Sequence, residues 1–193
     1  EIPPSSPIST ESNTSQVSSR DNEINADTLS LAEIFSSSPN NSEATEKSFL
    51  DQAELAMLEK DFRSALLFTR RAIRENPKNA AAWHMAAQAH FLLGEGDEAE
   101  MKSLEATRHA PEDLGYHMDY LRIARETLAG RRYLEELEKA HEHFPESIEI
   151  LWQLARYYHI AEKKPTTAAI LYRKLLAMAP SGNPLRPEAE REL

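Results

Sequence analysis

The sequence predicts an all-α protein in which about four helical hairpins repeat side by side as a solenoid. The first observation is a period: prolines recur at intervals of 34, 34 and 35 residues, at Pro77, Pro111, Pro145 and Pro180. The second is that two helix-forming runs, separated by a short break, precede each of these prolines. A fixed period of this length is typical of repeat arrays, in which each unit buries its apolar face against its neighbours.

Composition excludes several classes of function. The chain has 193 residues and a net charge of −10, which disfavours binding to nucleic acids and to anionic membrane surfaces. No run approaches the roughly 20 apolar residues of a membrane span. The absence of cysteine excludes disulfides, thiolate zinc sites and cysteine nucleophiles, and it suits the cytosol and export alike. Because Glu1 is not preceded by Met or by an apolar signal segment, we expect a trimmed or mature product.

Residues 1–44 are predicted to form a largely disordered, acidic tail. They are rich in Ser, Asn and Pro and carry a net charge of −6, with too few apolar side chains to offset the entropy of ordering. Within the tail, residues 27–36 show helical spacing of three apolar side chains, Leu31, Ile34 and Phe35. Three interpretations stay open: a short helix that packs on the array, a docking motif, or plain disorder.

Residues 45–193 have the periodicity of eight helices. The predicted pairs are 46–58 with 61–75, 80–93 with 96–109, 113–127 with 130–143, and 148–161 with 165–178. The repeat units accordingly span about 46–79, 80–113, 114–147 and 148–182, followed by a partial capping helix at 186–193, after which we expect the natural chain to continue. Glycines supply turns within the pairs, at Gly94 and Gly130 among others. Pro165 suits the first turn of its helix, and the period-setting prolines stop each second helix.

At these spacings the sequence resembles the tetratricopeptide repeat family over roughly residues 46–180. The second unit has the family's residues at its fourth, eighth, twentieth, twenty-seventh and thirty-second places: Trp83, Ala87, Ala99, Ala106 and Pro111. The first unit has Phe49, Ala53, Ala65, Ala72 and Pro77 at the same places. Small residues at the eighth and twentieth places let the paired helices cross closely.

The third and fourth units depart from this pattern. Leu121 and Tyr133 replace the two small crossing residues of the third unit, whereas Arg156 and Leu175 are the departures in the fourth. Because larger side chains hold backbones apart, we expect the helices of the third pair to be separated more widely than the others.

We find no constellation that predicts catalysis. The sequence contains no glycine-rich phosphate loop and no nucleophile-elbow motif. Its seven histidines form no His-Glu-x-x-His motif and no pair four residues apart, and its carboxylates lie beside bases at helical spacings. We therefore assign no catalytic residue, no cofactor and no metal ligand, and we do not expect an enzyme.

The resemblance implies that the first helix of each pair lines a concave groove. The residues expected there are His84, Gln88, Phe91, Met118, Arg122, Arg125, Gln153, Tyr157 and Ile160. Its apolar members suit an extended or helical peptide, and its arginines can pair with carboxylates. Chaperone-docking members of the family use a Lys/Asn clamp, but Leu50 and Glu54 occupy the first unit's places for it, which disfavours a co-chaperone role.

The sequence therefore predicts a non-enzymatic scaffold that binds a protein or peptide partner within a larger assembly. A first alternative is an adaptor that regulates or associates with itself, because the acidic tail and its stripe of Leu31, Ile34 and Phe35 could occupy the groove of this chain or of a neighbour. A second is the regulatory subunit of an enzyme. A Ser/Asn-rich tail ahead of such an array favours a bacterial envelope or secretion context.

Overall fold

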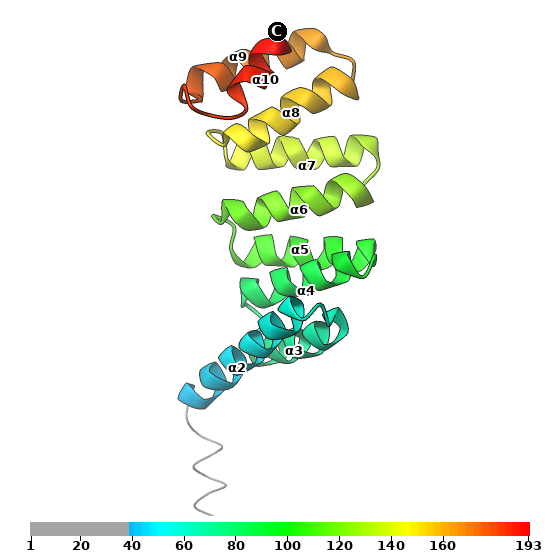
Figure 1. Ribbon diagram of the computed structural model, residues 1–193, viewed down its shortest axis with the longest axis vertical. Coiled ribbons are helices and arrows are strands. Elements are labelled where there is room, and N and C mark those ends of the chain that lie inside the picture. The colour runs from blue at the N-terminus through cyan, green and yellow to red at the C-terminus, as the bar shows by residue number, and fades with distance from the viewer. Residues whose placement is uncertain (1–38) are drawn as a thin grey trace, which may run out of the picture. The chain divides into compact units, whose positions relative to one another are not determined.

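The computed structural model describes residues 39–193, and their side chains from residue 43 onward. This part of the chain contains helices and no strands, which confirms the all-α prediction. In chain order the helices are α2 (Pro39–Leu58), α3 (Phe62–Glu75), α4 (Ala80–Leu92), α5 (Gly96–His109), α6 (Leu114–Thr127), α7 (Gly130–His143), α8 (Ile148–Ile160), α9 (Pro165–Met178) and α10 (Arg186–Arg191). They stack in this order, each against the next (Figure 1).

The first described helix, α2, starts earlier than the sequence predicted. It begins at Pro39 rather than near Glu46, so residues 39–44 are helical although they were assigned to the tail. Proline is well suited to a first helical turn. Glu46 is buried and accepts hydrogen bonds from the side chains of Asn76 and Asn79, which ties this part of α2 to the loop before α4.

The first helices of the later pairs begin at side-chain caps that follow the repeat period. Asn79, Asp113 and Ser147 each accept a hydrogen bond from the backbone N–H three residues onward, at 3.2, 3.1 and 3.3 Å. Such caps satisfy backbone donors that have no partner within the helix. Because the three caps recur every 34 residues, α4, α6 and α8 start at equivalent levels of the stack.

The alanines expected where paired helices cross are fully buried. Ala53 and Ala65 lie between α2 and α3, and Ala87 and Ala99 lie between α4 and α5, all with no exposed surface. In the third pair Leu121 and Tyr133 fill these places and are buried as well. The backbones of α6 and α7 consequently come close at far fewer positions than those of the other pairs, as the larger side chains predicted.

The described chain ends with the short helix α10, close to the predicted capping helix. Ala189 of α10 is fully buried against α9. Arg186 donates hydrogen bonds of 2.9 Å to the carbonyl oxygens of Leu176 and Ala179, at the end of α9. Carbonyls that lack a partner at the end of α9 are therefore satisfied by a side chain of the next helix.

Candidate functional site

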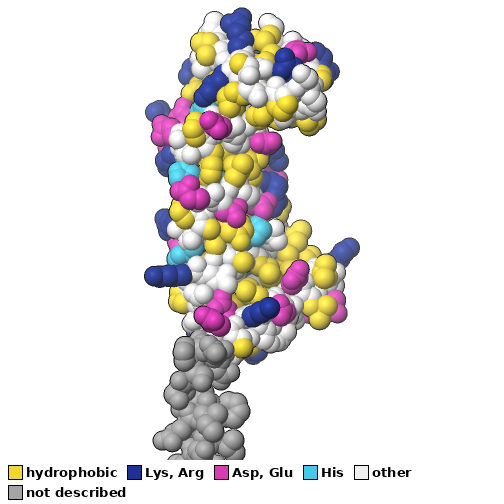
Figure 2. Space-filling model, turned by 90° about the vertical axis from the view of Figure 1, so that its left-hand side faces the viewer, with side chains coloured by type: hydrophobic (Ala, Val, Ile, Leu, Met, Phe, Trp, Pro, Cys, Tyr) yellow, Lys and Arg dark blue, Asp and Glu magenta, His cyan; other side chains and the backbone are white. Residues whose placement is uncertain are grey.

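The predicted groove residues belong to three first helices, α4, α6 and α8. Both ends of the stack of residues 39–193 project beyond its middle on one side, and hydrophobic side chains gather along the hollow between them (Figure 2). The groove residues divide into two groups by their contacts, one between α4 and α6 and one around α6, α7 and α8.

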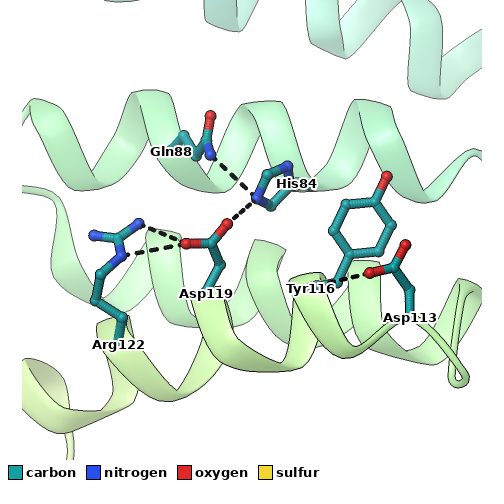
Figure 3. A network of polar contacts seen from close by, with 6 residues as sticks. All are labelled: His84, Gln88, Asp113, Tyr116, Asp119 and Arg122. Atoms are coloured by element: carbon teal, nitrogen blue, oxygen red, sulfur yellow. Dashed lines mark hydrogen bonds and ion pairs between the residues drawn. The ribbon is translucent and has the colours of Figure 1, made fainter. Parts of the chain in front are cut away.

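The first group is a polar network centred on Asp119, which the sequence analysis did not single out. His84 Nε2 of α4 lies 2.6 Å from Asp119 Oδ2 of α6 and 3.1 Å from Gln88 Nε2 (Figure 3). Arg122 donates from Nε and Nη2 to Asp119 Oδ1, at 3.3 and 3.2 Å. One carboxylate thus joins α4 to α6.

Arg122 of this network also lies over the face of the Phe91 ring. The guanidinium carbon of Arg122 lies 4.8 Å from the centre of the Phe91 ring, within the range of a cation–π contact. The charge of Arg122 is therefore already paired, with a carboxylate on one side and an aromatic face on the other. In this group the predicted residues His84, Gln88, Phe91 and Arg122 link two helices, and a ligand would have to compete for them.

The second group surrounds Gln153 of α8. The Gln153 amide nitrogen donates to the sulfur of Met118 at 3.9 Å, and its oxygen accepts a hydrogen bond of 3.0 Å from the Tyr133 hydroxyl. Tyr133 and Tyr157 meet edge to face with ring centres 5.5 Å apart. Burial raises the pKa values of both phenols, so both stay neutral donors at physiological pH.

A cavity of about 360 Å³ opens beside this second group. Its lining residues are Arg125, Leu128, Gly130, Tyr133, Trp152, Gln153, Arg156, Tyr157, Ile160 and Ala161, and we call it the α6–α8 pocket. The sequence predicted Arg125, Gln153, Tyr157 and Ile160 among them. It missed the others as site residues, although Tyr133 and Arg156 are two of the places where the chain departs from the repeat pattern.

The pocket adjoins the turn of the third helix pair, where a glycine begins α7. The turn between α6 and α7 contains Gly130, whose φ of +33° is unfavourable for other residues. A Cβ there would lie 3.8 Å from the Tyr157 hydroxyl. Gly130 at the start of α7 lines the pocket, and α6 and α7 come close at few positions.

The charge in the pocket is positive and weakly compensated. Arg125 is 61% exposed, and its nearest carboxylate is that of its chain neighbour Glu126, at 3.9 Å. Arg156 has no carboxylate within ion-pair distance among the described residues; its guanidinium carbon lies 5.7 Å from the centre of the Trp152 ring. Two arginines at one apolar pocket can bind carboxylates, which a guanidinium recognises with two parallel hydrogen bonds.

Four other hollows in residues 39–193 contain none of the predicted groove residues. Two larger hollows, of about 470 and 540 Å³, adjoin the α7–α8 loop, but Glu146 lines both and neither contains a predicted groove residue. No group of three or more histidine or acidic side chains in this part of the chain is arranged to hold a metal ion. None of its helices has both the length and the apolar character needed to cross a membrane.

A family model described as tetratricopeptide repeat matches residues 56–101, from the end of α2 into α5. The same hairpin geometry recurs to α9. Residues 56–101 therefore match the tetratricopeptide repeat family, and the hairpins of residues 39–193 share the fold of a solved tetratricopeptide repeat protein. No curated protein matches its sequence significantly.

Three solved structures share this fold. YrrB, described as a protein with an unusual peptide-binding site, superimposes with a TM-score of 0.59 at 17% identity, over 86% of this chain and 79% of YrrB. PilF of Pseudomonas aeruginosa superimposes with a TM-score of 0.57 at 17% identity, over 78% of this chain and 67% of PilF. An O-GlcNAc transferase mutant of Thermobaculum terrenum superimposes with a TM-score of 0.54 at 22% identity over 70% of this chain. The matched part is only 26% of the transferase chain.

Proposed function

We propose that the chain is a scaffold that holds a peptide or helix of a partner protein along the face of α4, α6 and α8. The α6–α8 pocket is the anchor of this face. The observation that supports the proposal is the combination of apolar walls with Arg125 and Arg156, neither of which has a close carboxylate partner beyond Glu126. Anchoring pockets of peptide-binding surfaces combine buried aromatic surface with a few polar groups that set orientation.

The pocket defines the chemistry of the partner. Tyr157, together with the small exposed parts of the buried Tyr133 and Trp152, offers aromatic surface to one large apolar side chain. Arg125 and Arg156 then require one or two carboxylates beside that side chain. The Asp119 network holds α4 against α6 next to the pocket, so a bound peptide meets a preformed surface and loses little free energy to reorganisation.

The proposal is tested with a labelled peptide library in which an apolar residue is flanked by Asp or Glu. A matched library carries Asn or Gln at the same places. We expect the acidic peptides to bind the chain and the Arg125→Ala/Arg156→Ala variant to bind them at least about tenfold more weakly, because each charge-assisted contact contributes on the order of 1.5 kcal/mol or more.

Arg131→Ala is the control, because Arg131 of α7 is 89% exposed, pairs with Glu135 of its own helix and lies outside the pocket. Its affinity should equal that of the unmodified chain. Equal binding of the acidic and amide libraries, or equal loss in the control, would rule out the pocket as a carboxylate-binding anchor. Circular dichroism and thermal unfolding of each variant establish that the fold is retained.

Two further roles stay predictions from the sequence. A regulatory subunit of an enzyme would present the same face to its catalytic partner, and a turnover assay with and without the chain tests that role. The bacterial envelope context is tested by fractionating cells of the source organism and locating the chain by immunoblot. A chain found only in the cytosolic fraction would contradict it.

A further inference from the structure

One segment of this sequence matches the chemistry of the α6–α8 pocket. Residues 27–35, which lie outside the described residues, read Asp-Thr-Leu-Ser-Leu-Ala-Glu-Ile-Phe. Three of their apolar side chains have helical spacing, and two of their residues are acids, Asp27 and Glu33. The segment therefore carries the large apolar side chains and the two carboxylates that the walls and the two arginines of the pocket require.

The connection before α2 is too short to bring the segment to the pocket of its own chain. Phe35 lies four residues before Pro39, so an extended connection reaches about 14 Å. The pocket lining includes residues at the ends of α6 and α8. These helix ends lie at the side of the stack opposite the start of α2 (Figure 1). The 20 residues of α2 alone span about 30 Å. In addition, α4 and α5 lie between α2 and α6 in the stack (Figure 1).

We infer that the α6–α8 pocket binds residues 27–35 of a second copy of this chain, an inference that rests on the proposed function of the pocket. Ile34 or Phe35 enters between the aromatic walls, and Asp27 and Glu33 pair with Arg125 and Arg156. The net charge of −6 on residues 1–44 favours the encounter with these arginines.

This contact joins two different surfaces. A chain that donates its segment still has an empty pocket. A chain whose pocket is filled still has its own segment free to bind another chain. Such a contact between unlike surfaces continues into longer assemblies or closes into a ring, whereas a contact between identical patches stops at a dimer. The same interface therefore repeats from each chain to the next.

The test is sedimentation velocity on the full chain over a hundredfold range of concentration. The Ile34→Ser/Phe35→Ser variant removes the apolar side chains of the segment, and the Arg125→Glu/Arg156→Glu variant reverses the charge of the pocket. We expect the unmodified chain to show a mass that rises with concentration and each variant alone to stay monomeric. An equal mixture of the two variants should form a one-to-one complex and nothing larger, because it retains one intact segment and one intact pocket.

Two controls keep the result decisive. Arg131→Glu reverses one charge on α7 outside the pocket and should associate like the unmodified chain. If the double pocket variant fails to fold, Ile160→Asp replaces it, because Ile160 is 63% exposed and its substitution leaves the core intact. A monomeric unmodified chain, association that persists in the variants, or a mixture that forms no complex would overturn the inference.

A labelled peptide of residues 24–37 separates this inference from the proposed function. We expect it to bind the Ile34→Ser/Phe35→Ser chain and to lose at least about tenfold in affinity when Arg125→Glu and Arg156→Glu are added. If this peptide does not bind while other acidic apolar peptides do, the pocket is a partner site and the second copy is not its ligand. If no acidic apolar peptide binds, the proposed function fails as well.

Discussion

His84 of α4 and Asp119 of α6 approach to 2.6 Å between Nε2 and Oδ2, and this contact joins the first helices of two successive repeats. Asp119 also accepts both Arg122 hydrogen bonds, so one carboxylate holds the side chains that frame this part of the groove. The repeat pattern assigns groove places one at a time. The structure shows that neighbouring places are coupled through a residue between them.

Replacement of Asp119 by alanine should destabilise the chain and uncouple α4 from α6. We expect the free energy of unfolding to fall by about 1–2 kcal/mol, because His84 and Arg122 both lose a charge-assisted partner at a partly exposed site. Urea denaturation of Asp119→Ala, His84→Ala and the double variant measures the coupling, for which we expect about 1 kcal/mol. Additive effects of the two substitutions would show that the contact carries no energy. Glu126→Ala, at an exposed place on α6, is the control.

Tyr172 should tolerate the loss of its hydroxyl group. This side chain is 1% exposed, its oxygen has no hydrogen-bond partner among the described residues, and burial raises its pKa to about 12. Because an unpaired buried hydroxyl costs free energy, Tyr172→Phe should leave the free energy of unfolding unchanged or raise it by up to about 1 kcal/mol. Tyr133→Phe is the matched comparison and should lose about 1 kcal/mol with its hydrogen bond to Gln153. Equal losses in both variants would contradict this interpretation.

Two histidines should make the fold sensitive to mild acid. Burial, together with nearby His143, lowers the pKa of His117 against the opposing effects of the Pro111 carbonyl, Asp113 and Glu112. Burial and Lys174 likewise lower the pKa of His141, beside which Glu142 acts in the opposite direction. The folded state therefore favours the neutral rings. The two neutral histidines contribute fully to stability above about pH 6.5, the pKa of histidine in the unfolded chain. This contribution is lost as the pH falls through their lowered pKa values in the folded state.

Chemical denaturation between about pH 7.5 and pH 5 measures this effect. Glutamine at either position cannot titrate, so His117→Gln and His141→Gln should each make stability less dependent on pH in this range. Lys174 donates to the His141 ring at 3.1 Å, and Lys174→Met should also weaken the dependence by removing the charge that opposes protonation. A slope that all three substitutions leave unchanged would assign the acid sensitivity to other groups.

The eighth place of the repeat should show opposite size preferences in the second and third units. Ala87 is fully buried where α4 and α5 approach closely, and Ala87→Leu should destabilise by about 1–3 kcal/mol through overpacking. Leu121 fills the same place between the more widely separated α6 and α7, and Leu121→Ala should destabilise by about 2–4 kcal/mol through the cavity that it leaves. Urea denaturation measures both losses. A Leu121→Ala variant as stable as the unmodified chain would mean that α6 and α7 close up without it.

Most of the fold could be predicted because its signals are local. Pro111, Pro145 and Pro165 mark helix ends or starts, and the paired alanines mark close crossings; each of these effects acts within a few residues of its position. The start of α2 could not be predicted in this way. Residues 39–44 resemble the tail in composition, and the helix there is continuous with a segment that Glu46 attaches to the loop before α4.

The sequence by itself determined the repeat period, the helical hairpins and the helices that carry the groove, because proline spacing and apolar periodicity are properties of neighbouring residues. Only the tertiary structure decided which groove residues are engaged and which are available. Arg122 pairs with Asp119 on its own helix, and α4 adds Phe91 and His84 to that pair. Arg125 and Arg156, by contrast, come from different helices and meet at one pocket. These outcomes depend on distances between helices, which the packing of residues far apart in the chain sets.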